Sequence, residues 1–361
     1  MADDQTVRFA LALTTAVAGL VAFIITLLGA RMLTRSRHPL IPFDHPNHRS
    51  LHSLPTARIG GVAITAGVLA GWMASIITMS LSAGVTRTLA GLSTPGADAP
   101  WLAQSALRVI LLAAGFLMLI GFIDDHRSLS VRVRFGFQVV CAAIALFAMD
   151  LALDWPIQIL VLIGIVWMTN LYNFMDGADG LAASTATIGF AALALLAYAA
   201  TDIRIMLICA VLAAASSAFL IVNWSPARAF LGDTGSIPLG FLAATLAIVG
   251  SARGDWPLWC AMLVFAPFIT DATVTLLRRS WRREKVWQAH RSHYYQRLVL
   301  LGWRHGDVAR AYGAANLICA AIAITIQHAR PHVQAAGIAL IGIGLLSAAL
   351  LIDRRWARRP D

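Results

Sequence analysis

Charged residues are scarce in this sequence. Asp, Glu, Lys and Arg together make up 13% of its 361 residues, whereas 59% are hydrophobic. A soluble globular domain carries about 25% charged residues, so the composition excludes that class. Cysteine is scarce as well, and the cysteines lie singly in apolar stretches without the spacing of metal ligands. We interpret these four as small packing residues: Cys141, Cys209, Cys260 and Cys319.

Long apolar runs dominate the chain instead. A helix crosses the hydrocarbon core of a bilayer with about 20 apolar residues. The sequence predicts eleven such spans, near 8–30, 60–82, 104–123, 133–153, 155–173, 181–200, 203–222, 235–252, 256–277, 308–328 and 333–353. The eighth is the least regular, because Gly and Pro open it. We therefore expect an all-α, polytopic integral membrane protein with one membrane domain over residues 1–361.

The distribution of Lys and Arg predicts the orientation of these spans. With the N-terminus outside, most of the 28 Lys and Arg residues fall on the inner side. The positive-inside rule then places the C-terminus in the cytoplasm. The inner segments lie near 31–59, 124–134, 173–181, 223–236 and 278–307. The net charge of +10 is mainly a topology signal, and it favours anionic lipids and phosphorylated substrates over nucleic acid as partners.

A short stretch of the first inner loop, residues 44–61, carries three His and two Arg. It includes His52 and Arg58 and runs into the Gly60-Gly61 pair at the start of the second span. A plain connector rarely combines these residues, so we regard the loop as a candidate binding segment. A solvated basic loop is the alternative interpretation.

Two adjacent acids, Asp124 and Asp125, end the third span. Neighbouring residues on a helix point about 100° apart, so we expect the two carboxylates to have different tasks. One can face a metal while the other faces a proton or a second substrate. The alternative is a pair of interface carboxylates bonded to Arg127 and Arg132. However, the helix dipole disfavours acids at a helix C-terminus, which argues for function.

A polar series ends the fifth span. Its members recur every three residues and would form one polar stripe if the helix persists: Asn170, Asn173, Asp176 and Asp179. Gly177 and Gly180 allow a turn and a close backbone approach to a ligand, as phosphate sites often require. A polar helix end with a Gly cap would explain Gly180 but not the two Asn and two Asp.

A Gly-Asp-Thr-Gly-Ser turn at 232–236 opens the eighth span, a short distance after Asn223. Such a turn supplies backbone amides for phosphate oxygens, and its Asp233 can hold the Mg²⁺ that accompanies phosphate groups. Phe230, directly before it, can stack on a base, although an interfacial aromatic belt explains a single Phe equally well.

The ninth span and the loop after it contain further candidates. Asp271 is either a functional intramembrane carboxylate or a partner of Arg278, and the sequence leaves both interpretations open. The loop carries His290, Arg291 and His293. The two histidines lack a third zinc ligand, so we favour phosphate contact by His and Arg together. A basic segment on the membrane surface is the alternative.

Taken in order, these five segments resemble the MraY/WecA family of polyprenyl-phosphate N-acetylhexosamine-1-phosphate transferases (glycosyltransferase family 4). The resemblance covers most of the chain, from Asp44 to Arg297. It looks closest to the O-antigen-initiating, WbpL-like branch, whose loops read D-x-P-N-x-R-S-x-H-x-x-P-T-P-R-x-G-G and H-R-x-H-x-Y-Q-R-L. This sequence departs from that branch at Ala57, where the branch usually has Pro.

The resemblance implies roles for individual residues. Asp233 would be the ligand of Mg²⁺, for which Mn²⁺ can substitute, and Asp124 and Asp125 would lie beside the reacting phosphates. His290 and His293 would be catalytic, and the sequence does not choose between them. The residues implied to bind substrate are Asn173, Asp176, Asp179, Asn223, Phe230, His52, Arg58 and Arg291.

The implied reaction transfers an N-acetylhexosamine-1-phosphate from a UDP-sugar to undecaprenyl phosphate and releases UMP. It would start a lipid-linked surface glycan at the cytoplasmic face of the bacterial inner membrane, and the resemblance favours a homodimer. The alternatives are a secondary transporter with intramembrane acids and a peptidoglycan phospho-MurNAc-pentapeptide transferase. Transporter sites lie near the membrane midplane, whereas nearly every candidate here lies at one surface.

Overall fold

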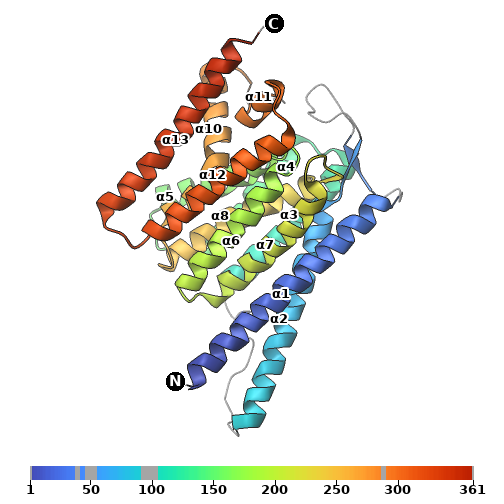
Figure 1. The fold of residues 1–361 in the computed structure, drawn as a ribbon, viewed down its shortest axis with the longest axis vertical. Coiled ribbons are helices and arrows are strands. Elements are labelled where there is room, and N and C mark those ends of the chain that lie inside the picture. Colours follow the sequence, from blue (N-terminus) through green and yellow to red (C-terminus); the bar gives the residue numbers. More distant parts are fainter. Residues whose placement is uncertain (1, 37–40, 45–54, 91–104, 286–289, 360–361) are drawn as a thin grey trace.

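A computed structural model describes residues 2–36, 41–44, 55–90, 105–285 and 290–359 (Figure 1). These ranges contain thirteen helices and three short strands. In chain order the elements are α1 (Ala2–Arg35), β1 (Phe43–Asp44), β2 (Thr56–Arg58), α2 (Gly60–Ala90), α3 (Ser105–Arg127), α4 (Val131–Met149), α5 (Trp155–Phe174), α6 (Leu181–Ala199), α7 (Ile203–Asn223), β3 (Ala229–Phe230), α8 (Asp233–Ala252), α9 (Leu258–Val264), α10 (Ala266–Trp281), α11 (Tyr294–Leu300), α12 (His305–Ile326) and α13 (Pro331–Ala357).

Ten of the described helices are long and apolar enough to cross a membrane, and α9 with α10 gives an eleventh candidate span. The predicted all-α, polytopic fold is therefore confirmed. The ninth predicted span, 256–277, differs in shape, because α9 and α10 meet at an angle of 79°. Pro267 lies in the first turn of α10. It lacks the N–H that a continuous helix needs, and its ring would clash with the carbonyl one turn earlier.

The centre of the bundle is α8, which continues through Pro238 as one helix of 20 residues. In its most apolar stretch 78% of the residues are buried, compared with 11% for α13. Figure 1 shows α13 at one side of the bundle and the α1–α2 pair at the other. The four cysteines are buried and form no disulfide, as expected of packing residues. Because α8 is buried from its first turn, its N-terminus is surrounded by other elements.

A small sheet, which the sequence analysis did not predict, joins the first inner loop to the segment before α8. Strand β2 pairs antiparallel with β1 and parallel with β3. The parallel register sets Arg58 opposite Phe230. The strands have two or three residues each, too few for an alternating hydrophobic pattern to be visible in the sequence. The sheet nevertheless fixes which loops meet.

Two glycines allow α2 and α3 to reach the backbone of α8. A Cβ atom at Gly61 would collide with the backbone of Thr234 and Gly235, and one at Gly121 would collide with the carbonyl of Asp233. Only a residue without a side chain permits this approach. The start of α2, the end of α3 and the start of α8 consequently form one tightly packed corner.

Candidate functional site

The acids predicted from three separate segments meet at this corner. Asp124 and Asp125 end α3, Asp233 begins α8, and Asp176 follows the end of α5. We call these four residues the aspartate cluster. Two arginines lie among them: Arg58 from β2 and Arg134 from α4.

Asp125 holds the N-terminus of α8. Its carboxylate accepts hydrogen bonds from the backbone N–H groups of Asp233 at 3.1 Å and Thr234 at 3.0 Å, and from the Thr234 hydroxyl at 2.7 Å. Arg58 contacts it at 3.3 Å, and the Asp125 side chain is fully buried. A carboxylate at a helix N-terminus satisfies free amides and complements the helix dipole. In this arrangement Asp125 fixes the start of α8.

Asp124 and Asp233 share one guanidinium. The Nη1 atom of Arg134 lies 2.8 Å from Asp124 and 2.6 Å from Asp233. The backbone N–H of Leu129 also donates to Asp124, at 2.5 Å. The partner of the acid pair is thus Arg134, not the Arg127 or Arg132 considered from the sequence. Asp124 and Asp125 thus have different partners, and different tasks for the two carboxylates stay a prediction.

Asn173 ties the end of α5 to the same cluster. Its side-chain amide donates to Asp233 at 2.8 Å and to the hydroxyl of Ser236 at 2.9 Å. Ser236 and Arg134 were missed by the sequence analysis. The available signal for Arg134 was the run of arginines directly after the acid pair, and for Ser236 its place in the turn at 232–236.

The predicted polar stripe does not persist, because α5 ends at Phe174 and residues 175–180 form a turn. Its members consequently point to different neighbours. Asn170 donates to Gln138 at 2.7 Å and Asn173 to Asp233, whereas Asp179 contacts His305 at 3.2 Å. The one-stripe expectation was wrong for this physical reason. The polar residues instead connect α5 to three different parts of the bundle.

Asp176 is the acid of the cluster that lacks a protein partner. Among the described residues, its half-buried carboxylate forms no hydrogen bond and no ion pair. Burial raises the pKa of Asp176 well above its usual range, and the charge of nearby Asp233 raises it further. A bound cation would stabilise both carboxylates.

This geometry fits Mg²⁺ at the cluster. The described ranges contain no group of three or more His, Cys, Asp or Glu residues arranged to hold a metal ion. Mg²⁺ does not require such a group, because it commonly binds through one or two carboxylates together with water and substrate phosphates. Asp233, with Asp176 beside it, provides such a pair.

Asp179 and Asn223 are buried and form hydrogen bonds within the protein. Asp179 accepts a hydrogen bond from the backbone N–H of Ala227 at 3.2 Å. Asn223 accepts from the N–H of Gly180 at 3.0 Å and donates to the carbonyl of Ala229 at 2.8 Å. They hold the turn at 175–180 against the segment that leads into β3. The structure thus gives them a positioning role beside the predicted role in substrate binding.

The remaining residues predicted to bind substrate are Arg58, Phe230, Arg291 and His52. Arg58 lies within it, between Asp44 at 2.7 Å and Asp125. Phe230 is partly exposed in β3 opposite Arg58, and Arg291 is exposed in the loop before α11. His52 lies outside the described residues.

His290 and His293 lie side by side with their rings tilted by 33°, and we call them the histidine pair. Their ring centres are 4.8 Å apart. Burial lowers the pKa of His290 to about 4, and the neighbouring His293 adds to the effect, so His290 is neutral at physiological pH. The His293 ring lies 6.2 Å from Phe174, at the end of α5. The histidine pair therefore neighbours the helix end that carries Asn173.

Asp271 holds the histidine pair in place. Its buried carboxylate accepts hydrogen bonds from the backbone N–H groups of Tyr294 at 2.9 Å and Tyr295 at 3.0 Å, and from the Tyr312 hydroxyl. It also lies 3.3 Å from Nδ1 of His293. Arg278, the partner considered from the sequence, binds Asp353 instead. Pairing of Asp271 with Arg278 was therefore wrong, whereas a functional role for this carboxylate stays a prediction.

The geometry defines a polytopic membrane protein in which acids and arginines from separate chain segments meet, with the histidine pair near the end of α5. Residues 107–251 match the family model described as glycosyl transferase family 4. It contains the Asp124-Asp125 pair and Asp233.

Three curated relatives extend the similarity along the chain. A probable undecaprenyl-phosphate N-acetylglucosaminyl 1-phosphate transferase of Bacillus subtilis (strain 168) is 28% identical over 79% of this chain and 78% of its own. A phospho-N-acetylmuramoyl-pentapeptide-transferase of Geobacillus kaustophilus is 27% identical, covering 78% and 86%. A decaprenyl-phosphate N-acetylglucosaminephosphotransferase of Mycobacterium tuberculosis is 26% identical, covering 84% and 82%. The predicted resemblance to this group of transferases is confirmed; its O-antigen-initiating branch stays a prediction.

Proposed function

We propose that this protein is a membrane transferase that moves an N-acetylhexosamine-1-phosphate from a UDP-sugar to undecaprenyl phosphate and releases UMP. The observation that carries the proposal is the aspartate cluster at one end of the membrane helices, with Arg58 and Arg134 among its acids. A lipid phosphate reaches such a position from the bilayer, and a soluble nucleotide sugar reaches it from water. The names of all three relatives describe sugar-phosphate transfer or a closely related reaction.

Phosphoryl transfer depends mainly on positioning and on charge neutralisation, and the cluster contains groups for both. We assign Mg²⁺ to Asp233 and Asp176, where it would neutralise the diphosphate and the departing UMP. Arg58 and Arg134, now paired with carboxylates, are placed to exchange those partners for phosphate oxygens. The predicted phosphate contacts of His290, His293 and Arg291 belong to the same proposal.

Of the acid pair, we assign the proton-accepting role to Asp124. Asp125 is fully buried and accepts hydrogen bonds from three donors at the start of α8, whereas Asp124 retains some exposure beside Arg134. Asp124 would accept the proton of the lipid phosphate, whose oxygen then attacks the β-phosphorus. The new bond joins that oxygen to the β-phosphorus, and the bond between the β-phosphorus and the bridging oxygen breaks, so UMP leaves. A covalent aspartyl-phosphate route is the mechanistic alternative.

The proposed orientation puts the cluster at the cytoplasmic face of the bacterial inner membrane, as the distribution of Arg predicts. The starting step of O-antigen or related glycan synthesis is the proposed pathway role. A transporter is the less favoured function, because its acids would be expected near the midplane.

An assay with purified protein, Mg²⁺, undecaprenyl phosphate and a panel of UDP-N-acetyl sugars tests the proposal. The panel includes UDP-GlcNAc, UDP-GalNAc and the UDP-MurNAc-pentapeptide. We expect UMP release with at least one sugar, and near-complete loss of release in Asp124→Asn and Asp233→Asn. Asp154→Asn is the matched control, because Asp154 is exposed at the opposite end of α5 and its side chain makes no capping bond. No release with any sugar, or full release from both cluster variants, would exclude the function.

A further inference from the structure

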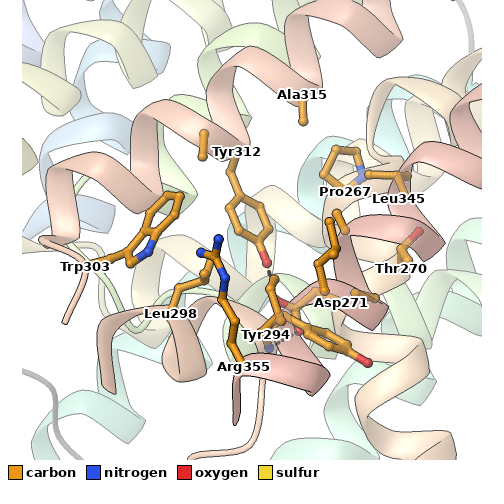
Figure 2. Close-up of a pocket in the computed structure, with 15 residues that line it drawn as sticks. Pro267, Thr270, Asp271, Tyr294, Leu298, Trp303, Tyr312, Ala315, Leu345 and Arg355 are labelled. Atoms are coloured by element: carbon orange, nitrogen blue, oxygen red, sulfur yellow. Dashed lines mark hydrogen bonds between the residues drawn. The ribbon is translucent and has the colours of Figure 1, made fainter. Parts of the chain in front are cut away.

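A cavity of about 300 Å³ lies between α10, α12 and α13, and Asp271 is among the residues that line it (Figure 2). Small side chains on two facing helices leave the space open: Ala311 and Ala315 on α12, and Ala348 and Ala349 on α13. Tyr312 crosses the cavity, and its hydroxyl points to Asp271 in Figure 2.

Most of the cavity lining is apolar, and the surrounding helices belong to the membrane. Protein interiors are close-packed and rarely keep voids much larger than a water molecule. Apolar cavities stay dry and bind apolar molecules. The outer face of α13 is exposed, with Leu346 and Leu350 each 53% accessible, so lipid chains lie directly beside the cavity. Hydrocarbon is therefore the expected filling.

The size of the cavity corresponds to part of one lipid chain. A methylene group occupies roughly the volume of a water molecule in the liquid, about 30 Å³. The cavity thus has room for about ten chain carbons. The rest of an ordinary acyl chain would continue into the bilayer.

The charge at the mouth of the cavity is positive. Arg355 from α13 lines it together with Trp303 and Leu298 (Figure 2). The neighbouring Arg278 and Arg297 share one carboxylate, Asp353, which both of them contact. No described carboxylate forms an ion pair with Arg355. A guanidinium and a Trp at the end of a membrane helix match the phosphate level of a lipid bilayer.

We propose that this cavity holds one acyl chain of an anionic phospholipid, whose phosphate binds Arg355. The cavity adjoins the histidine pair through Asp271, which lines it and contacts His293, but neither histidine lines the cavity. Tyr294 and Leu298 of α11 line the cavity, whereas the hydroxyl of Tyr295, on the same helix, donates to the carbonyl of Phe174 on α5. The cavity and the end of α5 therefore contact adjacent residues of α11.

Native mass spectrometry of the delipidated full-length protein in detergent tests the proposal. Phosphatidylglycerol and phosphatidylcholine are titrated separately, without a UDP-sugar, so the result does not depend on transferase activity. We expect phosphatidylglycerol to bind about tenfold more tightly, since phosphate contacts with arginine are stronger when no choline cation competes. Equal affinity for the two lipids would overturn the proposal.

Two pairs of variants locate the binding. Ala315→Leu fills the cavity and should lower phosphatidylglycerol affinity at least tenfold, whereas Ala314→Leu, at the exposed neighbouring position, should leave it within twofold. Arg355→Gln should weaken phosphatidylglycerol about five- to tenfold and leave phosphatidylcholine unchanged. Arg354→Gln, an exposed neighbour outside the cavity lining, is its control.

The other possible results of these experiments also support or contradict the proposal. If Ala315→Leu does not fold, the arginine pair carries the test, because both side chains are exposed and unimportant for packing. Equal effects of Arg354→Gln and Arg355→Gln would show general surface attraction and contradict the site. Undecaprenyl phosphate is added as a competitor. If it displaces phosphatidylglycerol one for one and its binding depends on Arg355, the cavity belongs to the acceptor lipid and the proposal is wrong.

Discussion

Asp124, Asp176 and Asp233 of the aspartate cluster are held differently from Asp271. The fourth member, Asp125, resembles Asp271, because it accepts two backbone N–H bonds and one hydroxyl bond. In the aspartate cluster, Asp124 and Asp233 are balanced by the guanidinium of Arg134, and Asp176 has no described partner. Asp271 is bound by two backbone N–H groups and a tyrosine hydroxyl, and its side chain is 2% accessible.

This difference distinguishes acids that can take part in the reaction from an acid that stabilises the fold. An arginine at an accessible edge can exchange a carboxylate for a phosphate without a change of fold. The donors around Asp271 belong to the start of α11 and to α12, so Asp271 cannot change partners unless α11 moves. Buried polar groups with every partner satisfied rigidify a structure. We therefore expect the cluster to control turnover and Asp271 to control stability.

The largest expected effect belongs to Asp176→Asn, which removes the unpaired carboxylate. If Asp176 helps to hold Mg²⁺, kcat for UMP release should fall about 1,000-fold. The melting temperature should stay the same or rise, because the variant removes repulsion with Asp233. Steady-state kinetics and a thermal melt of the same preparation check both parts. A kcat within threefold of the wild type would contradict the expectation that the cluster controls turnover and Asp271 controls stability.

Asp271→Asn should mainly reduce stability. An amide cannot accept all the hydrogen bonds that converge on this carboxylate, so the free energy of unfolding should fall by about 3 kcal/mol. Unfolding by a denaturing detergent gives the value, with Asp154→Asn as the exposed control. The comparison fails if Asp271→Asn retains wild-type stability and loses only turnover.

Arg134→Gln sharpens the comparison within the cluster. It removes the guanidinium that Asp124 and Asp233 share, so kcat should decrease about tenfold. Arg132→Gln, two residues away on α4 and without a carboxylate contact among the described residues, should change kcat less than twofold. Initial rates at saturating UDP-sugar measure the difference. Equal losses in the two variants would mean that the effect is one of general surface charge.

The smallest effect concerns the turn between the two groups. Burial opposes ionisation of Asp179, but the hydrogen bond and charge of His305 hold the pKa of Asp179 below its usual range. The contact thus stabilises the fold at pH values above the ordinary carboxyl pKa of about 4 and is lost as the pH falls below it. The free energy of unfolding of the wild type should exceed that of Asp179→Asn by about 1 kcal/mol or less at pH 6, and in thermal melts this advantage should shrink as the pH falls below about 4. An advantage that grows toward pH 4 would contradict the assignment.

Local signals account for the parts of the structure that the sequence predicted. Apolar runs define the spans, because a membrane helix satisfies its own backbone hydrogen bonds. The acids at 124–125 and 233 and the histidines at 290 and 293 stand out because such residues are costly at a membrane boundary. Pro267 could have predicted the break in the ninth span, since proline interrupts a helix wherever it occurs.

Non-local contacts account for what was missed. The partner of Asp271 is the backbone of residues 23 and 24 positions away, and backbone amides have no sequence signature. Arg134 reaches Asp233 across 99 positions. The polar series after Asn170 failed as a stripe because α5 ends at Phe174, four residues into it. Which polar residues belong to one site was therefore visible only once the helices were packed.

The central claim is the transfer of sugar and phosphate together. Purified protein is given undecaprenyl phosphate, Mg²⁺ and UDP-N-acetylglucosamine carrying ³²P in the β-phosphate, with the other UDP-N-acetyl sugars labelled in parallel. We expect the label to move into the lipid phase in step with the appearance of UMP. Release of labelled UDP, or no transfer of label from any of the sugars, would contradict it.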